Sequence, residues 1–134
     1  MSLALDTNVL VRLLTRDDDV QCAAAEWLVN TAVSHGERVM VSTGVLLETE
    51  WVLRSRYNLV PEKIRLAFNA ILETDEIMVQ ELSILEESLK IWREHSGADF
   101  ADCVHVATAV QSNRILATFD KNAAKLHGAA LIPQ

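Results

Sequence analysis

The chain has 134 residues, of which 50% are hydrophobic, and a formal net charge of −7 at pH 7. This length suits one domain over residues 1–134, and the apolar content excludes a disordered chain. No apolar run is long enough to cross a membrane and no signal sequence precedes the first apolar run, so we expect a soluble, cytoplasmic protein. The negative charge argues against a broad basic surface for nucleic acid.

Short apolar runs alternate with helical stretches along the chain. The runs expected to form strands are Leu3–Leu5, Val39–Val41, Ile77–Val79, Ile115–Phe119 and Ala130–Ile132. Helices are expected directly after Asp6, from the Asp17–Asp19 cluster to about His35, over Val45–Tyr57, from Pro61, from Ser83 to near Gly97, and over Asp99–Asn113. Because short apolar runs between helices are typical of a parallel sheet covered on both faces, we predict an α/β three-layer sandwich with five parallel strands.

Several helix ends carry local signals. The Asp17–Asp19 cluster is a plausible N-cap, and Pro61 suits a first helical position. Ser83 and Glu86 have the spacing of a capping box. The two cysteines, Cys22 and Cys103, lie in apolar helical patterns and are predicted to be small core residues.

Five carboxylates occupy positions with little structural reason to be acidic. Asp6 and Asp120 each follow a predicted strand, and Glu48 lies inside an apolar helical segment. Asp99 and Asp102 are three residues apart, which places them on one helix face. Ligands of open parallel sheets bind at the carboxyl ends of strands, so we expect the five side chains to meet at that edge.

A set of oxygen ligands without His or Cys suits magnesium or manganese. A metal held by carboxylates can activate water and neutralise charge on a phosphate, which is the chemistry of phosphodiester hydrolysis. A structural interpretation stays open for single members of the set. Asp6 or Asp120 alone could be a helix cap or turn former, and Asp99 alone could be an N-cap beyond Gly97.

Four segments resemble the motifs of PIN domains, in the same order. They are Leu5–Leu10 with Asp6, Glu48 followed by Trp51–Leu53, Gly97–Asp102 followed by Ala107, and Thr118–Lys121 with Asp120. The resemblance runs the full length of the chain and is greatest to the VapC-type toxins of bacterial toxin–antitoxin pairs. Ala123 departs from the bulky apolar residue that often follows the fourth motif.

This resemblance implies a sheet in the order 3-2-1-4-5 and a magnesium- or manganese-dependent endoribonuclease. It implies a homodimer held inactive by a small antitoxin. Asp6, Glu48 and Asp102 would be the core metal ligands, with Asp99 and Asp120 completing the cluster. Asn8 and Thr118 would be supporting polar residues near it. PIN domains that are not toxins share the acidic set, so a non-toxin nuclease is an alternative.

Some residues outside the acidic set carry further expectations. Glu50 lies two residues from Glu48 and is expected to face solvent. Arg12 and Arg54 are candidates to contact a substrate phosphate, although a solvated arginine is the simpler interpretation. Apolar helix surface near Phe68 and Trp92 is expected to be available for a dimer.

Two functions of other classes compete with the nuclease. A phospho-accepting receiver domain would need an aspartate after the third strand and a lysine after the fifth, where this chain has Gln80-Glu81 and Pro133. A pure binding role would leave the acidic set structural, and failure to bind any divalent metal would favour it.

Overall fold

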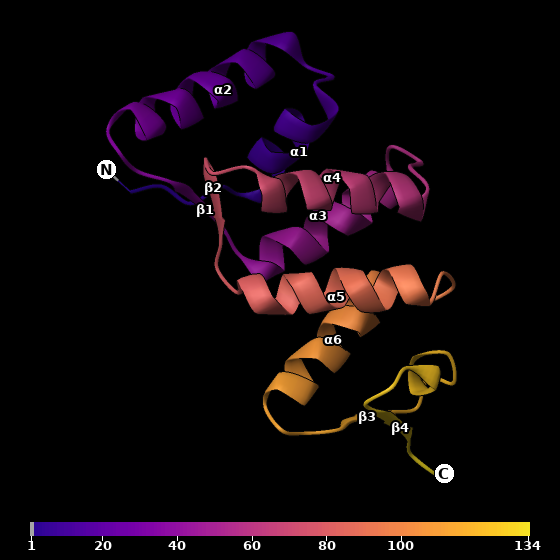
Figure 1. Cartoon of the computed structure of the whole chain (residues 1–134). Helices are drawn as coiled ribbons and strands as arrows, with labels where there is room; N and C mark the ends of the chain where they lie inside the picture. Colours follow the sequence, from indigo (N-terminus) through magenta and orange to yellow (C-terminus); the bar gives the residue numbers. More distant parts are fainter. Residues whose placement is uncertain (1) are drawn as a thin grey trace. The chain divides into compact units, whose positions relative to one another are not determined.

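A computed structural model describes residues 2–134 and divides the chain into two compact units. The N-terminal unit is Met1–Gln80 and the C-terminal unit is Glu81–Gln134. In Figure 1 the first runs from indigo to pink and the second from pink to yellow. The prediction of a single domain over residues 1–134 stays a prediction.

The N-terminal unit contains four helices and two strands. The helices are α1 (Thr7–Thr15), α2 (Asp19–Ser34), α3 (Thr43–Ser55) and α4 (Pro61–Glu73), and the strands are β1 (Val39–Val41) and β2 (Ile77–Val79). Helix α1 packs against both α2 and α3, and α3 against α4. The core of this unit takes buried apolar side chains from all of these helices and strands. The largest of those with almost no exposed surface are Leu10, Leu46, Leu53, Ile64 and Phe68.

The C-terminal unit contains helices α5 (Leu82–Glu94) and α6 (Phe100–Gln111), strands β3 (Leu116–Thr118) and β4 (Ala129–Leu131), and a 3-10 turn η1 (Ala123–Lys125). Helices α5 and α6 pack closely together. Between them lie Trp92 and Phe100, whose ring centroids are 5.0 Å apart. The Trp92 indole donates to the Ala98 carbonyl at 3.0 Å, which fixes the turn between the two helices.

The predicted five-stranded sheet is wrong in its extent. Residues 2–134 form four three-residue strands in two parallel pairs, β1–β2 and β3–β4. The run Leu3–Leu5 forms only one bridge, between Ala4 and Met40. Both backbone hydrogen bonds of this bridge involve Met40, whose N–H donates to Leu3 at 2.8 Å and whose carbonyl accepts from Leu5 at 2.9 Å. The pairing ends there because helix α1, capped by Asp6, starts directly after Leu5. The α/β class and the parallel pairing are confirmed.

Local capping signals explain most helix starts. Asp18 caps α2 by accepting from the Gln21 amide at 2.9 Å, and Pro61 occupies the first turn of α4, both as predicted. The predicted capping box is wrong, because α5 begins at Leu82 and has no side-chain cap. The Ser83 hydroxyl instead donates to Gln111 at 2.9 Å, a contact between α5 and α6.

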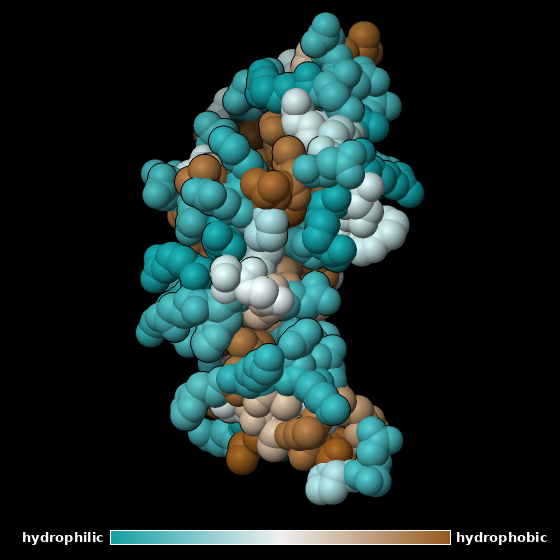
Figure 2. Space-filling view, turned by 90° about the vertical axis from the view of Figure 1, so that its right-hand side faces the viewer, coloured by the Kyte–Doolittle hydropathy of each residue, from teal (hydrophilic) through white to brown (hydrophobic). Residues whose placement is uncertain are grey.

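Phe68 and Trp92 are themselves 0% and 1% exposed, whereas Leu66 on α4 and Leu82 on α5 are 59% and 49% exposed. A dimer surface on these helices stays a prediction. The largest exposed aromatic side chain is Trp27 on α2, which is 67% exposed. In the C-terminal unit, exposed apolar side chains gather around β3 and β4, where Figure 2 shows brown surface at its lower end; they are Val110, Ile115, Phe119 and Leu131. Cys22 and Cys103 are buried, as predicted.

None of the helices in the described part of the chain has both the length and the apolar character needed to span a membrane.

Candidate functional site

Asp6 caps the first helix. Its Oδ1 accepts from the backbone N–H of Val9 at 3.0 Å, and its extended backbone (φ −87°, ψ 177°) is typical of an N-cap. The side chain is exposed, and its Oδ2 accepts no hydrogen bond from residues 2–134. The structural interpretation of Asp6 is therefore correct, and it leaves one carboxylate oxygen available to a cation.

Glu48 is fixed by a residue that the sequence analysis missed. The Thr7 hydroxyl, at the start of α1, donates to Oε1 of Glu48 on α3. Thr7 is buried, whereas Glu48 is exposed, so the buried hydroxyl anchors an accessible carboxylate. The signal was present, because Thr7 lies between Asp6 and Asn8 in the first motif. This hydrogen bond couples the first acidic motif to the second.

Glu50 is buried, which contradicts the expectation that it faces solvent. It is 3% exposed, and its Oε2 accepts from Nε of Arg54 at 2.8 Å. Glu50 lies four residues after Leu46 and three before Leu53, so it shares their buried face. The inward face of α3 therefore passes through Glu50 and leaves Glu48 at its exposed edge.

Asp102 lies in the first turn of α6, whose N-cap residue is Asp99. Burial raises the pKa of Asp102, and the neighbouring charges of Asp99 and Asp120 raise it further, while His105 acts in the opposite sense. Asp99 and Asp120 are thus close enough to Asp102 for their charges to disfavour its ionisation. A cation bound beside Asp102 would relieve this repulsion.

Asp120 also has a structural role. Its Oδ1 accepts from the backbone N–H groups of Asn122 and Ala123 at 2.7 and 3.1 Å, which starts the turn η1. The Thr118 hydroxyl accepts from the Asp120 N–H at 3.0 Å, so Thr118 orients the residue from behind. As with Asp6, these contacts use Oδ1 only, and Oδ2 accepts no hydrogen bond from the described residues.

Removing the charge of Asp102 is expected to stabilise the metal-free protein. A raised carboxyl pKa in the folded state means that ionisation costs folding free energy, and this cost grows as the pH rises from the unfolded pKa to the folded pKa, above which it is complete. Asp102→Asn should therefore raise Tm at pH 7 in the presence of a chelator. The gain should shrink as the pH falls through the raised pKa.

Thermal unfolding followed by circular dichroism measures this effect, with Glu86→Gln as the control. Glu86 is an exposed carboxylate of α5 in the same unit, so its substitution changes the net charge equally. A lower Tm for Asp102→Asn than for Glu86→Gln at pH 7 would contradict the prediction.

The donors present fit a divalent cation by their chemistry. All five predicted ligands are carboxylates, the donors that magnesium and manganese prefer, and the charges of Asp99 and Asp120 act unfavourably on ionised Asp102. Within residues 2–134, however, the side chains do not form a group of three or more acidic, His or Cys residues poised to hold a metal ion. The fit is one of chemistry and charge, and the ligand set stays a prediction.

A cavity of 330 Å³ lies in the N-terminal unit between α1 and α2. Asp6, Asn8, Arg12 and Gln21 line it, so it begins at the first acidic motif. Arg12 and Arg54, the two candidate phosphate contacts, both hold intramolecular partners. Arg54 pairs with Glu50, and Arg12 lies 3.4 Å from Asp17.

A polar network around Asp17 holds Arg12. The Tyr57 hydroxyl donates to Oδ2 of Asp17 at 2.6 Å, and the Thr15 hydroxyl donates to Oδ1 at 2.8 Å. Arg12 Nη1 donates to the Tyr57 oxygen at 3.1 Å, and Nε donates to Gln21 at 2.7 Å. These contacts join the segment between α1 and α2 to Tyr57, which follows α3.

Tyr57→Phe is expected to raise the pKa of Asp17. Hydrogen bonds from Tyr57 and then Thr15 hold that pKa below its ordinary value of 3.8. A depressed pKa means that the contribution of Asp17 to stability is present above its unfolded pKa and is lost as the pH falls through the folded value. Carboxyl NMR titration of the variant measures the shift, with Thr15→Val, which removes the second-largest cause, expected to shift it less. An unchanged pKa in Tyr57→Phe would contradict the assigned cause.

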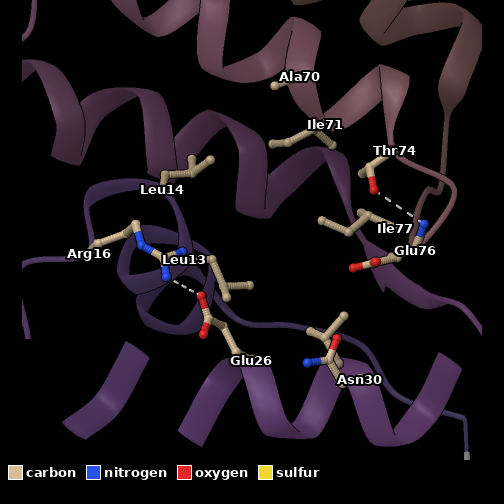
Figure 3. Close-up of a pocket in the computed structure, with 11 residues that line it drawn as sticks. Leu13, Leu14, Arg16, Glu26, Asn30, Ala70, Ile71, Thr74, Glu76 and Ile77 are labelled. Carbon is tan, nitrogen blue, oxygen red and sulfur yellow. Dashed lines mark hydrogen bonds and ion pairs between the residues drawn. The ribbon is translucent and has the colours of Figure 1, made fainter. Parts of the chain in front are cut away.

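A second cavity of the N-terminal unit lies away from the predicted site residues. It has a volume of 490 Å³ and is lined by residues of α1, α2, α4 and β2. Figure 3 shows Leu13, Ile71 and Ile77 on its apolar side and the Arg16–Glu26 ion pair on its polar side. None of the predicted ligands lines it, and we assign it no role in the chemistry.

Comparison of the whole sequence with models of known protein families tests the resemblance that the acidic motifs suggested. The model of the PIN domain matches residues 3–129, which spans both units. The chain belongs to the PIN domain family. None of the curated proteins compared with this chain matches it.

Membership of the PIN domain family indicates the general type of chemistry. PIN domains are generally metal-dependent nucleases, and they usually use divalent metal ions. All four acidic motifs lie inside the matched range, from Asp6 to Asp120. The receiver-domain alternative is set aside, because the chain belongs to a different family and lacks the aspartate and lysine that a receiver needs.

Proposed function

We propose that this PIN domain is a magnesium- or manganese-dependent endoribonuclease and the toxin of a toxin–antitoxin pair. The observation that carries the nuclease is the PIN match over residues 3–129, within which all five carboxylates occur in motif order. The repulsion of ionised Asp102 by Asp99 and Asp120 supports a cation as its partner. We also propose that the protein acts in the cytoplasm and that its substrate is RNA.

In this proposal Asp6, Glu48 and Asp102 hold the metal, and Asp99 and Asp120 complete the acidic set. When bound, the metal supplies an activated water and neutralises charge on the phosphate. The residues of the chain orient the ligands. Thr7 fixes Glu48, Thr118 orients Asp120, and the α1 N-cap fixes Asp6 with one oxygen left for the cation.

The net charge of −7 limits the number of phosphate contacts that we propose between the protein and RNA. A chain without a broad basic surface binds RNA through few phosphate contacts, so the affinity should depend only weakly on salt. The proposal therefore favours a narrow RNA segment recognised by its shape and its unpaired bases over a long duplex.

The test is cleavage of total cellular RNA with magnesium or manganese, beside a chelator control and a single-stranded DNA pool of matched length. We expect cutting of RNA that requires the metal. Cleavage that persists in chelator would contradict the metal requirement. Cleavage of DNA in preference to RNA would contradict the substrate.

The toxin role and the partners are tested separately. Expression of the chain should arrest growth, and co-expression of a cognate small antitoxin should restore it; a metal-dependent nuclease without growth arrest would favour the non-toxin alternative. We also propose a homodimer, for which the exposed Val20 and Trp27 of α2 supply apolar surface. Analytical ultracentrifugation of wild type and Trp27→Ala tests it.

A further inference from the structure

The cavity between α1 and α2 has two unlike sides. Its apolar wall is made by Val9 of α1 and by Ala25 and Leu28 of α2. Its volume of 330 Å³ lies at the small end of the range of about 300–1,000 Å³ that is usual for small-ligand sites. It is therefore large enough for a small group and too small for a helix.

The polar side of the cavity offers donors. Gln21 uses its carbonyl oxygen to accept from Arg12, so its amide N–H groups remain without a partner within residues 2–134. The Asn8 side chain makes no hydrogen bond to the described residues and is exposed. Two amide side chains thus flank an apolar wall, which is the combination that holds and reads the edge of a nucleobase.

Arg12 supplies a fixed cation on the same side. Its side chain is only 26% exposed, with Nε and Nη1 held by Gln21, Tyr57 and Asp17. No hydrogen bond from Nη2 to another described residue is present. A guanidinium fixed on one edge loses little conformational entropy when the other edge binds a phosphate oxygen.

We propose that this cavity is a nucleotide subsite for the RNA substrate, in which Arg12 binds a phosphate beside the cleaved one and the apolar wall takes the adjoining base. The proposal rests on the proposed nuclease function. Asp6 lines the same cavity and is one of the proposed metal ligands, so the subsite adjoins the proposed reaction centre. Asn8 and Gln21 then set the base preference at that nucleotide.

The first test measures binding without cleavage. Two proteins are compared in chelator: Asp102→Asn, which is the parent, and the same protein with the additional substitution Arg12→Met. Each is titrated with four labelled single-stranded RNA homopolymers. Loss of one charged hydrogen bond of about 1.5–3 kcal/mol predicts a loss of affinity of about 10- to 100-fold. The slope of log affinity against log salt should fall by about 0.7, as for one lost phosphate contact on a single strand.

The matched control is Arg93→Met, which removes one charge from the exposed face of α5. It should leave RNA affinity close to that of the parent. A second variant, Ala24→Trp, places a bulky ring at an exposed α2 position that lines the cavity and leaves Arg12 and its three side-chain partners unsubstituted. It should weaken binding even if Arg12→Met lowers the stability of the fold, which circular dichroism monitors.

The second test uses the active chain. Gln21→Leu should change the nucleotide found next to the cut in sequenced cleavage products. Because it also removes the partner of Arg12 Nε but keeps the Arg12 charge, it should lower RNA affinity less than Arg12→Met does. The proposal is overturned if Arg12→Met and Ala24→Trp bind RNA as the parent does, if the parent binds none of the four homopolymers, or if these variants alter only binding of a protein partner.

These outcomes separate the subsite from the nuclease. RNA binding that depends on Arg12 in a chain that cleaves nothing would overturn the proposed function and keep the subsite. Metal-dependent cleavage that Arg12→Met, Ala24→Trp and Gln21→Leu all leave unchanged would keep the function and overturn the subsite.

Discussion

Asp102→Asn is expected to reduce metal-dependent RNA cleavage at least about 100-fold, since losing a residue that only supports a metal ligand already costs about 10- to 100-fold. Asp102 is the half-buried member of the acidic set, and the charges of Asp99 and Asp120 act directly on it. The amide keeps the size of the side chain and removes the anionic ligand. Initial rates on a labelled RNA under saturating magnesium measure the loss.

Asp6→Asn provides a second test of the ligand set, and this substitution should leave the fold intact. Asparagine is as good an N-cap as aspartate, so the contact to Val9 should survive and α1 should remain capped. The Glu86→Gln control should retain the wild-type rate. Wild-type rates in both Asp102→Asn and Asp6→Asn would contradict the assigned ligands, whereas a loss in Asp102→Asn alone would remove Asp6 from the set.

Trp92→Ala is expected to destabilise the protein by about 3–5 kcal/mol, the usual cost of truncating a buried aromatic side chain. Trp92 is 1% exposed, its ring lies 5.0 Å from that of Phe100, and its indole N–H bonds to Ala98. The substitution opens a cavity between α5 and α6 and leaves the Ala98 carbonyl without its indole donor. Urea unfolding monitored by circular dichroism measures the free energy of unfolding.

Trp51→Ala is the matched control, because the same atoms are removed from a side chain that is 49% exposed and that we assign to no interface. Exposed substitutions of this kind usually change stability by no more than about 0.5 kcal/mol. A cost below about 1 kcal/mol for Trp92→Ala, or equal costs for the two variants, would contradict the assignment of Trp92 to the core.

Local chemistry made some elements predictable. Asp18 and Pro61 fix helix starts through a side-chain hydrogen bond and a preset backbone angle, and neither depends on distant residues. Ser83 shows the limit of such signals. Its hydroxyl bonds to Gln111, twenty-eight residues away, and that partner leaves no trace in the local pattern.

The face of α3 shows a second limit. Glu48 and Glu50 both lie in an apolar stretch, and the spacing of Glu50 from Leu46 and Leu53 places it on their buried face. Arg54, one turn later on the same helix, neutralises Glu50 at 2.8 Å, so this pairing is local. The contact that holds Glu48 outside that face comes from Thr7, 41 residues away, and this partner cannot be read from the local pattern.

Strand length was the least predictable feature. The runs of three to five apolar residues predicted a continuous sheet, but each strand has three residues and Leu3–Leu5 forms one bridge. The acidic set could be proposed because its order and spacing along the chain are visible in the sequence, and its role as a ligand set stays a prediction. The contribution of Asp6 and Asp120 as caps was also foreseeable, since aspartate after a strand commonly starts a turn or helix.

The division of the chain has a consequence for its synthesis. Asp6 and Glu48 lie in the N-terminal unit, and Asp99, Asp102 and Asp120 lie in the C-terminal unit. At about 5–20 residues per second, translation of the C-terminal unit takes about 3–11 s after Gln80 has been added. Under the proposed function, a nascent chain lacks Asp99 and Asp102 during the first part of this interval and lacks Asp120 until residue 120 has been added. The five carboxylates are therefore complete only late in synthesis, and cleavage that needs all of them cannot begin before that point.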